Sequence, residues 1–195
     1  MKTRFAVMFC VVLFGALGCV HSMEKEIEVH PRPEDDKDYF NVYNAATAHH
    51  EVISNFETKF IVQSTLLSSA FRQAFAKRYQ VLYSEKEPVL TEASTRTGFF
   101  VSLYTADREL GDMRDVNLWS IQLRKGEDSL KPIKVEKLRE KERWRPFFKG
   151  ISPWSHEFLV IFDSPASASG NQDLVQSKET KLVLSSQDGR VTMTF

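Results

Sequence analysis

The sequence predicts an α+β fold, in which an antiparallel, β-sandwich-like domain has two N-terminal helices packed against it. Three observations support this prediction. Apolar residues recur at helical spacing in the first half of the chain, short strand-like runs follow Pro88, and Asp188-Gly189 near the end is a strong hairpin signal. A chain of 195 residues with 42% hydrophobic and 12% aromatic residues has enough apolar surface for one packed domain.

Two helices are predicted in the first half of the chain. The first covers roughly residues 39–55, behind the candidate N-cap Asp38, and the second covers roughly residues 67–83. Residues 57–65, which lie between them, are rich in β-branched side chains and predict a strand.

Short runs of aromatic and β-branched residues, separated by Gly, Pro, Asp and Ser, predict the strands of the second half. These runs cover residues 98–106, 116–124, 131–138, 156–162 and 181–186. Behind the Asp188-Gly189 turn, Val191, Met193 and Phe195 alternate with polar residues and predict a final strand.

Two motifs stand out in this layout: residues 67–79 read LSSAFRQAFAKRY, and residues 147–154 read FFKGISPW. With these motifs the chain resembles uncharacterised exported proteins of Gram-negative bacteria, in which a helix of the first kind precedes a β region containing the second. The resemblance implies an exported α+β fold and no particular chemistry.

The N-terminus has the pattern of a secretion signal. Lys2 and Arg4 form a positive n-region, and residues 5–17 form an apolar h-region. About 13 apolar residues are too few to span a bilayer, which needs about 20. Residues 1–18 are therefore predicted to be a signal peptide.

A cysteine ends this apolar stretch, in the tetrapeptide Ala16-Leu17-Gly18-Cys19. This boundary resembles the lipobox of bacterial lipoproteins, although leucine is usual where Ala16 stands and a small residue where Leu17 stands. The resemblance implies cleavage before Cys19 and acyl chains such as palmitate on that residue, with Val20 implying an outer-membrane location facing the periplasm. Cleavage by the ordinary signal peptidase and a retained anchor remain the alternatives.

Cysteine usage favours the lipid attachment. The chain has only Cys10 and Cys19, and Cys10 leaves with the signal peptide. A single cysteine in an oxidising compartment cannot form an internal disulfide, and acylation removes its free thiol. We therefore expect Cys19 to attach the protein to a membrane.

Residues 19–37 are predicted to be a flexible tether, and residues 38–195 a single globular domain. Ten of the fifteen residues from 24 to 38 are charged, and such a segment cannot bury enough apolar surface to fold.

The charge balance argues against nucleic acid as a partner. The chain has 26 basic and 26 acidic residues, and removal of Lys2 and Arg4 leaves 24 against 26, a net charge of −2. Nucleic-acid-binding domains carry a basic excess instead. The eight glycines occur singly and form no phosphate-binding loop, so no cofactor is expected.

Three candidate catalytic or metal-binding groups have a simpler structural interpretation. His49 and His50 would diverge on a helix, so no metal is predicted there. His156, with Asp163 nearby in sequence, could serve as a base, but residues 155–157 are more typical of the start of a strand. The acidic segment 107–115 could hold calcium, but it is more typical of a solvated, ion-paired loop.

Residues 131–148 combine basic and aromatic side chains. Such side chains can contact anionic lipid headgroups or an anionic glycan. The pattern is more typical of an edge strand whose lysines prevent aggregation, with the aromatic rings turned into the core. The candidate contact residues are Lys134, Lys137, Arg139, Lys141, Arg143, Arg145 and Trp144.

The sequence therefore predicts a non-enzymatic envelope lipoprotein with a binding or structural role. Its expected partners are the membrane, through the lipid anchor, and an envelope protein or an anionic glycan or lipid. The alternatives are a binding module for anionic lipid or glycan that acts through residues 131–148, and an unrecognised hydrolase.

Overall fold

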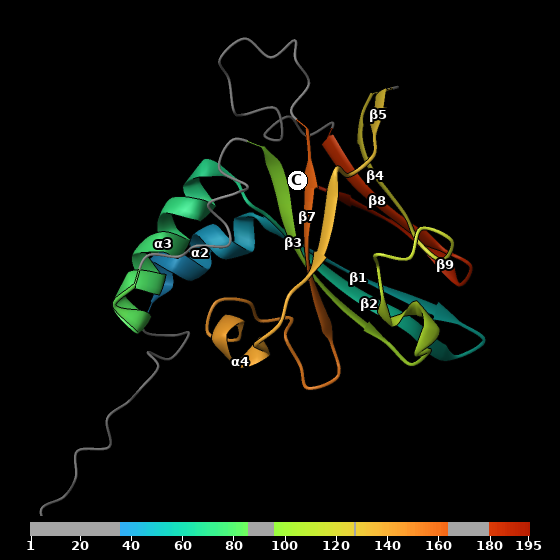
Figure 1. Ribbon diagram of the computed structural model, residues 1–195, viewed down its shortest axis with the longest axis horizontal. Coiled ribbons are helices and arrows are strands. Elements are labelled where there is room, and N and C mark those ends of the chain that lie inside the picture. Colours follow the sequence, from blue (N-terminus) through green and yellow to red (C-terminus); the bar gives the residue numbers. More distant parts are fainter. Residues whose placement is uncertain (1–35, 86–95, 127, 164–179) are drawn as a thin grey trace, which may run out of the picture.

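The computed structural model describes residues 36–85, 96–126, 128–163 and 180–195 (Figure 1). This part of the chain is β-rich, with strands in two antiparallel sheets and a few helices. The coarse α+β prediction is confirmed. The predicted signal peptide, Cys19 and nearly all of the predicted tether lie outside the described residues.

The larger sheet has five strands in the order β1-β2-β3-β7-β6, and each neighbouring pair is antiparallel. Its strands are β1 (Thr47–Ser54), β2 (Glu57–Leu66), β3 (Thr97–Thr105), β6 (Lys134–Lys137) and β7 (His156–Phe162). The strand predictions for 57–65, 98–106 and 156–162 are confirmed. Residues 131–138 form a strand over a shorter range than predicted.

The smaller sheet has four strands in the order β5-β4-β8-β9, also antiparallel. They are β4 (Ser120–Lys125), β5 (Asp128–Leu130), β8 (Thr180–Ser186) and β9 (Gly189–Thr194). The predicted hairpin at Asp188-Gly189 is confirmed, since it joins β8 to β9. The short strand β5 was not predicted.

The two longer helices begin at side-chain caps. In α2 (Lys37–Ala45) the amide of Tyr39 donates to the Asp36 carboxylate at 3.0 Å. In α3 (Ser69–Tyr83) the hydroxyl of Ser68 accepts from the Phe71 amide at 3.1 Å. These contacts satisfy amides that have no partner within the helix. Two short helices, η3 (Glu109–Gly111) and α4 (Lys141–Trp144), lie in connections between strands.

The prediction of a helix over residues 39–55 is wrong beyond residue 46. Helix α2 ends at Ala45, and residues 47–54 form β1, which pairs with β2 along its whole length. Apolar residues in this stretch recur at helical spacing, but pairing with β2 determines the conformation. The Thr47 and Thr65 hydroxyls share a hydrogen bond of 2.8 Å across this pair.

Alternate side chains of the larger sheet enter two different apolar clusters. One face contributes Phe99 and Val101 of β3 to a cluster that also contains residues of the smaller sheet, such as Leu182 and Val191. The other face contributes Phe100 to an aromatic cluster with α2, α3 and α4. We call this second face the helix-side face. Figure 1 shows α2 and α3 together on the side of the larger sheet away from β4, β8 and β9.

Aromatic rings dominate the helix-side cluster. Phe100 of β3 stacks on Phe148 with ring centroids 3.6 Å apart, and Phe75 of α3 lies 4.6 Å from Phe147. All four side chains are buried. Among the described residues, no helix is long and apolar enough to cross a membrane.

Candidate functional site

A row of polar side chains crosses the helix-side face of the larger sheet. In the strand register, His49 of β1 lies opposite Gln63 of β2, Gln63 opposite Ser102 of β3, and Ser102 opposite Glu157 of β7. Directly opposed residues have Cβ atoms about 5 Å apart, so the four side chains form one continuous row. The row interrupts the apolar pattern of this face.

The segment after α4 is fastened onto this row by hydrogen bonds. Ser102 Oγ donates to the Gly150 carbonyl at 2.9 Å. The Tyr43 hydroxyl accepts from Gln63 Nε2 at 2.9 Å and from the Lys149 amide at 3.1 Å. Burial raises the pKa of Tyr43, so this hydroxyl stays neutral.

Gly150 is needed for this close approach. A Cβ atom at position 150 would lie 2.0 Å from Gln63 Oε1, so any larger residue would displace the Gln63 amide. The turn that contains Lys149 and Gly150 is therefore held against the sheet by hydrogen bonds and by close packing.

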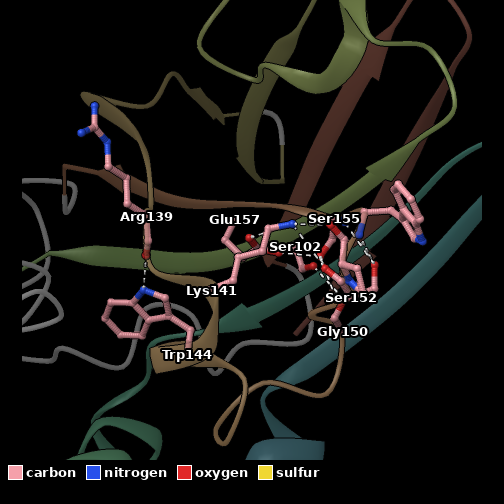
Figure 2. A network of polar contacts seen from close by, with 10 residues as sticks. Ser102, Arg139, Lys141, Trp144, Gly150, Ser152, Ser155 and Glu157 are labelled. Carbon is pink, nitrogen blue, oxygen red and sulfur yellow. Dashed lines mark hydrogen bonds and ion pairs between the residues drawn. The ribbon is translucent and has the colours of Figure 1, made fainter.

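A second set of polar contacts lies beside the hydrogen bond between Ser102 and Gly150 (Figure 2). Ser155 Oγ donates to Glu157 Oε1 at 2.5 Å and accepts from the Ser152 amide at 2.8 Å. Lys141 Nζ donates to the Ser152 and Pro153 carbonyls at 3.3 and 3.1 Å. These four hydrogen bonds join α4, the turn and β7.

Glu157 is the buried charge of this network, with 1% of its surface exposed. Its Oε2 atom lies 4.0 Å from Lys141 Nζ and has no hydrogen-bond partner among the described residues. Burying a carboxylate requires a compensating charge, which Lys141 supplies from a partly exposed position. We call Lys141, Ser152, Ser155 and Glu157 the clasp.

The turn that the clasp holds forms one wall of a cavity of about 440 Å³. We call it the Trp154 cavity. Trp154 is 75% exposed, whereas the chain's other two tryptophans, Trp119 and Trp144, are buried. The lining residues are His49, Ile61, Gln63, Ser102, Tyr104, Lys149, Gly150, Ser152 and Trp154, a set with no carboxylate.

The structure does not bring Ser155, His156 and Asp163 together. Ser155 bonds Glu157 on the helix-side face, whereas His156 points to the other face, where its Nε2 would lie 3.0 Å from a Cβ atom placed on Gly111. Asp163 pairs instead with Arg96 at 3.5 Å.

The pKa of His156 is lowered by its surroundings. Burial is the main cause, and the positive charges of Lys137 and Lys141 add to it, while Asp112 opposes them. This histidine therefore favours its neutral form.

The other candidate metal-binding groups are also separated. His49 and His50 are consecutive residues of a strand, so they point to opposite faces, and His49 alone lines the Trp154 cavity. In the acidic loop, Asp112 forms an ion pair with Arg114 at 2.5 Å, which lowers the pKa of Asp112 to about 2. The described residues include no group of three or more His, Cys, Asp or Glu side chains placed to hold a metal ion.

Several basic residues of the 131–148 segment have acidic or hydroxyl partners within the chain. Lys134 pairs with Glu136 at 3.0 Å, and Arg145 pairs with Glu142 at 2.8 Å. Arg143 pairs with Glu85 at 2.9 Å and also donates to the Tyr79 hydroxyl.

A second cavity, of about 360 Å³, lies within this segment. We call it the Arg139 cavity. Its charged lining consists of Lys137, Arg139 and Arg143 together with Glu136 and Glu140, and its apolar part consists of Tyr79, Leu138 and Trp144. The net charge of these lining residues is +1, three positive against two negative.

The aromatic residues of the segment belong to the core. Trp144 is 4% exposed, its indole N–H donates to the Arg139 carbonyl at 3.0 Å, and Phe147 and Phe148 are buried beside it. In Figure 2 the Arg139 side chain points away from Trp144. These rings therefore lie in the core, where the edge-strand interpretation of the segment places them.

The sequence patterns did not predict that Tyr43, Gln63 and Ser102 belong to a site. The available signal was a polar residue inside an otherwise apolar strand, as in FIVQST around Gln63 and FFVSLY around Ser102. Which residues lie opposite each other depends on strand register, which the local pattern does not specify.

No family model, no curated protein and no solved structure matches this chain. The functional evidence therefore comes from the site itself, because one fold can carry many functions.

Proposed function

We propose that this chain is a lipid-anchored protein of the bacterial cell envelope that binds a ligand and catalyses no reaction. The anchor is Cys19, preceded by a signal peptide over residues 1–18 and followed by a charged tether over residues 19–37. In this proposal the protein belongs to the outer membrane and faces the periplasm.

The Trp154 cavity is the observation that carries the binding role. Its volume of about 440 Å³ is within the range of small-ligand sites. Gln63, Ser102 and Gly150, which line it, are held in place by hydrogen bonds or close packing, so the cavity does not need to be built when a ligand arrives.

The arrangement of polar groups favours binding over catalysis. A nucleophilic serine needs a base within hydrogen-bond reach, and the base in turn needs an orienting partner. Ser155 instead bonds the carboxylate of Glu157 and is itself buried, and His156 lies on the opposite face of β7.

For the fold, we infer that the two sheets stack as a β-sandwich, with α2 and α3 packed on the outer face of the larger sheet. Support comes from the cluster that joins side chains of both sheets and from the aromatic cluster that joins the helices to Phe100, Leu159 and Ile161. The sandwich supplies a rigid platform for the cavity.

Intact mass spectrometry of the full-length protein extracted from membranes tests the anchor. We expect a mass that corresponds to cleavage before Cys19 plus two or three acyl chains, and we expect Cys19→Ala to lack these chains. An unmodified chain in the soluble fraction would contradict the lipid-anchor proposal.

A second candidate function is contact with an anionic lipid or glycan through residues 131–148. The observation that favours it is the Arg139 cavity, where Lys137 and Arg139 meet an apolar floor. Binding to vesicles of anionic lipid should weaken as salt is added.

The matched variants for this candidate are charge reversals at Lys137, Arg139 and Lys141. Reversal of Arg139 is the most informative, because its side chain is exposed and Lys141 has a structural role in the clasp. Binding that is indifferent to both salt and reversal would rule the candidate out.

A further inference from the structure

The Trp154 cavity also indicates a class of ligand. We infer that it binds a glycan, with one pyranose ring stacked on Trp154 and the hydroxyl groups of the sugar bonded to the polar floor. This inference rests on the proposed binding function and adds the chemistry of its ligand.

The exposed aromatic ring is the first observation. Trp154 leaves 75% of its surface in water, although burial of a tryptophan side chain is strongly favourable. A pyranose ring has an apolar face of C–H groups and a polar rim of hydroxyl groups. A flat indole beside a polar cavity suits both parts of such a molecule.

The cavity floor is the second observation. Gln63, Ser102, Ser152 and Tyr104 are neutral side chains that can donate or accept hydrogen bonds, and His49 adds an imidazole. A sugar presents several hydroxyl groups that both donate and accept, so a neutral floor of this kind matches it.

The charge of the lining is the third observation. Among the described residues, Lys149 is the only Lys or Arg of the lining, and its ammonium lies 4.6 Å from the centroid of the Phe40 ring. Since no carboxylate is among the described lining residues, they offer a cationic ligand no counter-charge. Neutral glycans and glycans carrying a carboxylate both remain compatible with this lining, and the experiment separates them.

Rigid support is the fourth observation. The turn that carries Trp154 is fixed by the amide of Trp154, which donates to Ser152 Oγ at 3.3 Å, and by the two carbonyls that bind Lys141. A stacking platform loses little conformational freedom on binding when its backbone is already held.

Trp154 provides its own readout for the test. The other two tryptophans are 3% and 4% exposed, so the solvent-exposed part of the fluorescence comes from Trp154. The full-length protein, in a detergent that has no sugar headgroup, would be titrated with N-acetylchitotetraose as the neutral probe. A disaccharide-peptide fragment of peptidoglycan would serve as the carboxylate-bearing probe.

We expect saturable binding of at least one probe, with a blue shift of the emission and reduced quenching by acrylamide. By calorimetry, Trp154→Ala should weaken binding at least tenfold, while Trp154→Tyr should keep most of the affinity. Phe56→Ala is the matched control, because Phe56 is a fully exposed aromatic residue outside the cavity lining, and its loss should leave the affinity unchanged.

The pattern of binding identifies the glycan. Binding of both probes, or of the neutral probe alone, supports a neutral glycan as ligand. Binding of the acidic probe alone, weakened by Lys149→Ala, supports a carboxylate-bearing glycan.

Three results would overturn the inference: no binding of either probe, equal affinity of the Trp154→Ala form, or an emission shift seen only with phosphatidylglycerol vesicles. The last result would identify a lipid surface as the ligand. The mass of the same preparation reports lipid attachment separately, so a failed titration and a failed anchor proposal remain distinguishable.

Discussion

The two ends of the helix-side face of the larger sheet have different chemistry, although β3 contributes to both. At the covered end, Phe100, Leu159 and Ile161 lie beneath the aromatic residues of the helices. At the open end, Gln63 and Ser102 lie beneath a turn, beside the Trp154 cavity. The covered end is packed core, and the open end leaves polar groups beside a cavity, where we propose that a ligand binds.

The transition between the two ends occurs within two residues of a strand. Phe100 stacks on a buried ring, whereas Ser102, the next residue of β3 on this face, donates to a backbone carbonyl at the edge of the cavity. One sheet face therefore changes from packed core to the edge of a cavity where polar residues replace apolar ones in one row.

The largest effect is expected at the covered end. Phe148→Ala removes a buried ring that stacks on Phe100, and we expect the free energy of unfolding to fall by about 3–5 kcal/mol. Chemical denaturation measures this change. Phe56→Ala is the matched control, because an exposed ring should cost less than about 0.5 kcal/mol. Similar losses in the two variants would contradict the comparison.

The clasp lies next to the open end and should have an intermediate effect. Lys141→Met leaves the Glu157 carboxylate buried without its counter-charge, and we expect a loss of about 1–3 kcal/mol. Glu157→Gln removes the charge that Lys141 balances. The double variant should therefore be more stable than the sum of the single effects predicts. Strictly additive effects would show that the two charges do not interact.

Stability can also be raised at the turn between β1 and β2. Asn55 and Phe56 join β1 to β2 with positive φ angles of 54° and 63°, a turn that favours glycine at its second position. We expect Phe56→Gly to stabilise the protein by about 0.5–1 kcal/mol, because glycine adopts this conformation without strain. Phe56→Ala keeps its Cβ atom and should give no such gain, and an equal gain in both variants would refute this explanation.

His156 lies on the other face of β7, and its titration should make the stability of the protein depend on pH. Its pKa in the folded protein is lowered from 6.5, so the unfolded state binds more protons as pH falls below neutrality. Stability should therefore be lost as pH decreases from 7 through the folded pKa. Thermal unfolding between pH 7 and 5 measures this loss, and His156→Gln should make the profile flatter. An unchanged profile would assign the pH dependence to other groups.

The smallest effect is expected at Trp154 itself. Its side chain is 75% exposed, so Trp154→Ala should change the free energy of unfolding by less than about 0.5 kcal/mol. Urea denaturation of this variant tests whether the open end contributes to stability. A loss of several kcal/mol would place Trp154 in the core.

Local patterns in the sequence predicted the elements whose periodicity and pairing agree. Helix α3 has Phe71, Phe75 and Tyr79 on its buried side, and β7 matches its predicted range. Strand β1 was predicted as helix because the Ala46-to-Ile53 spacing also fits a helical stripe. Its pairing with β2 is a tertiary contact that outweighs this local spacing.

The candidate site was less predictable than the fold. His49 was considered as a metal ligand and His156 as a catalytic base, but the structure places them on different faces of the larger sheet. The row that includes Gln63 and Ser102 can be recognised only when the register of four strands is known. Trp154 belongs to the FFKGISPW motif, and its exposure depends on how that segment folds against the sheet.

Calorimetric titration of the Trp154→Ala protein with the glycan that binds the unchanged chain, beside its unfolding curve, tests the proposed binding surface most directly. We expect an unfolding free energy within about 0.5 kcal/mol of the original and an affinity at least tenfold weaker. An affinity equal to that of the unchanged chain, at equal stability, would contradict the claim that the open end is the binding surface.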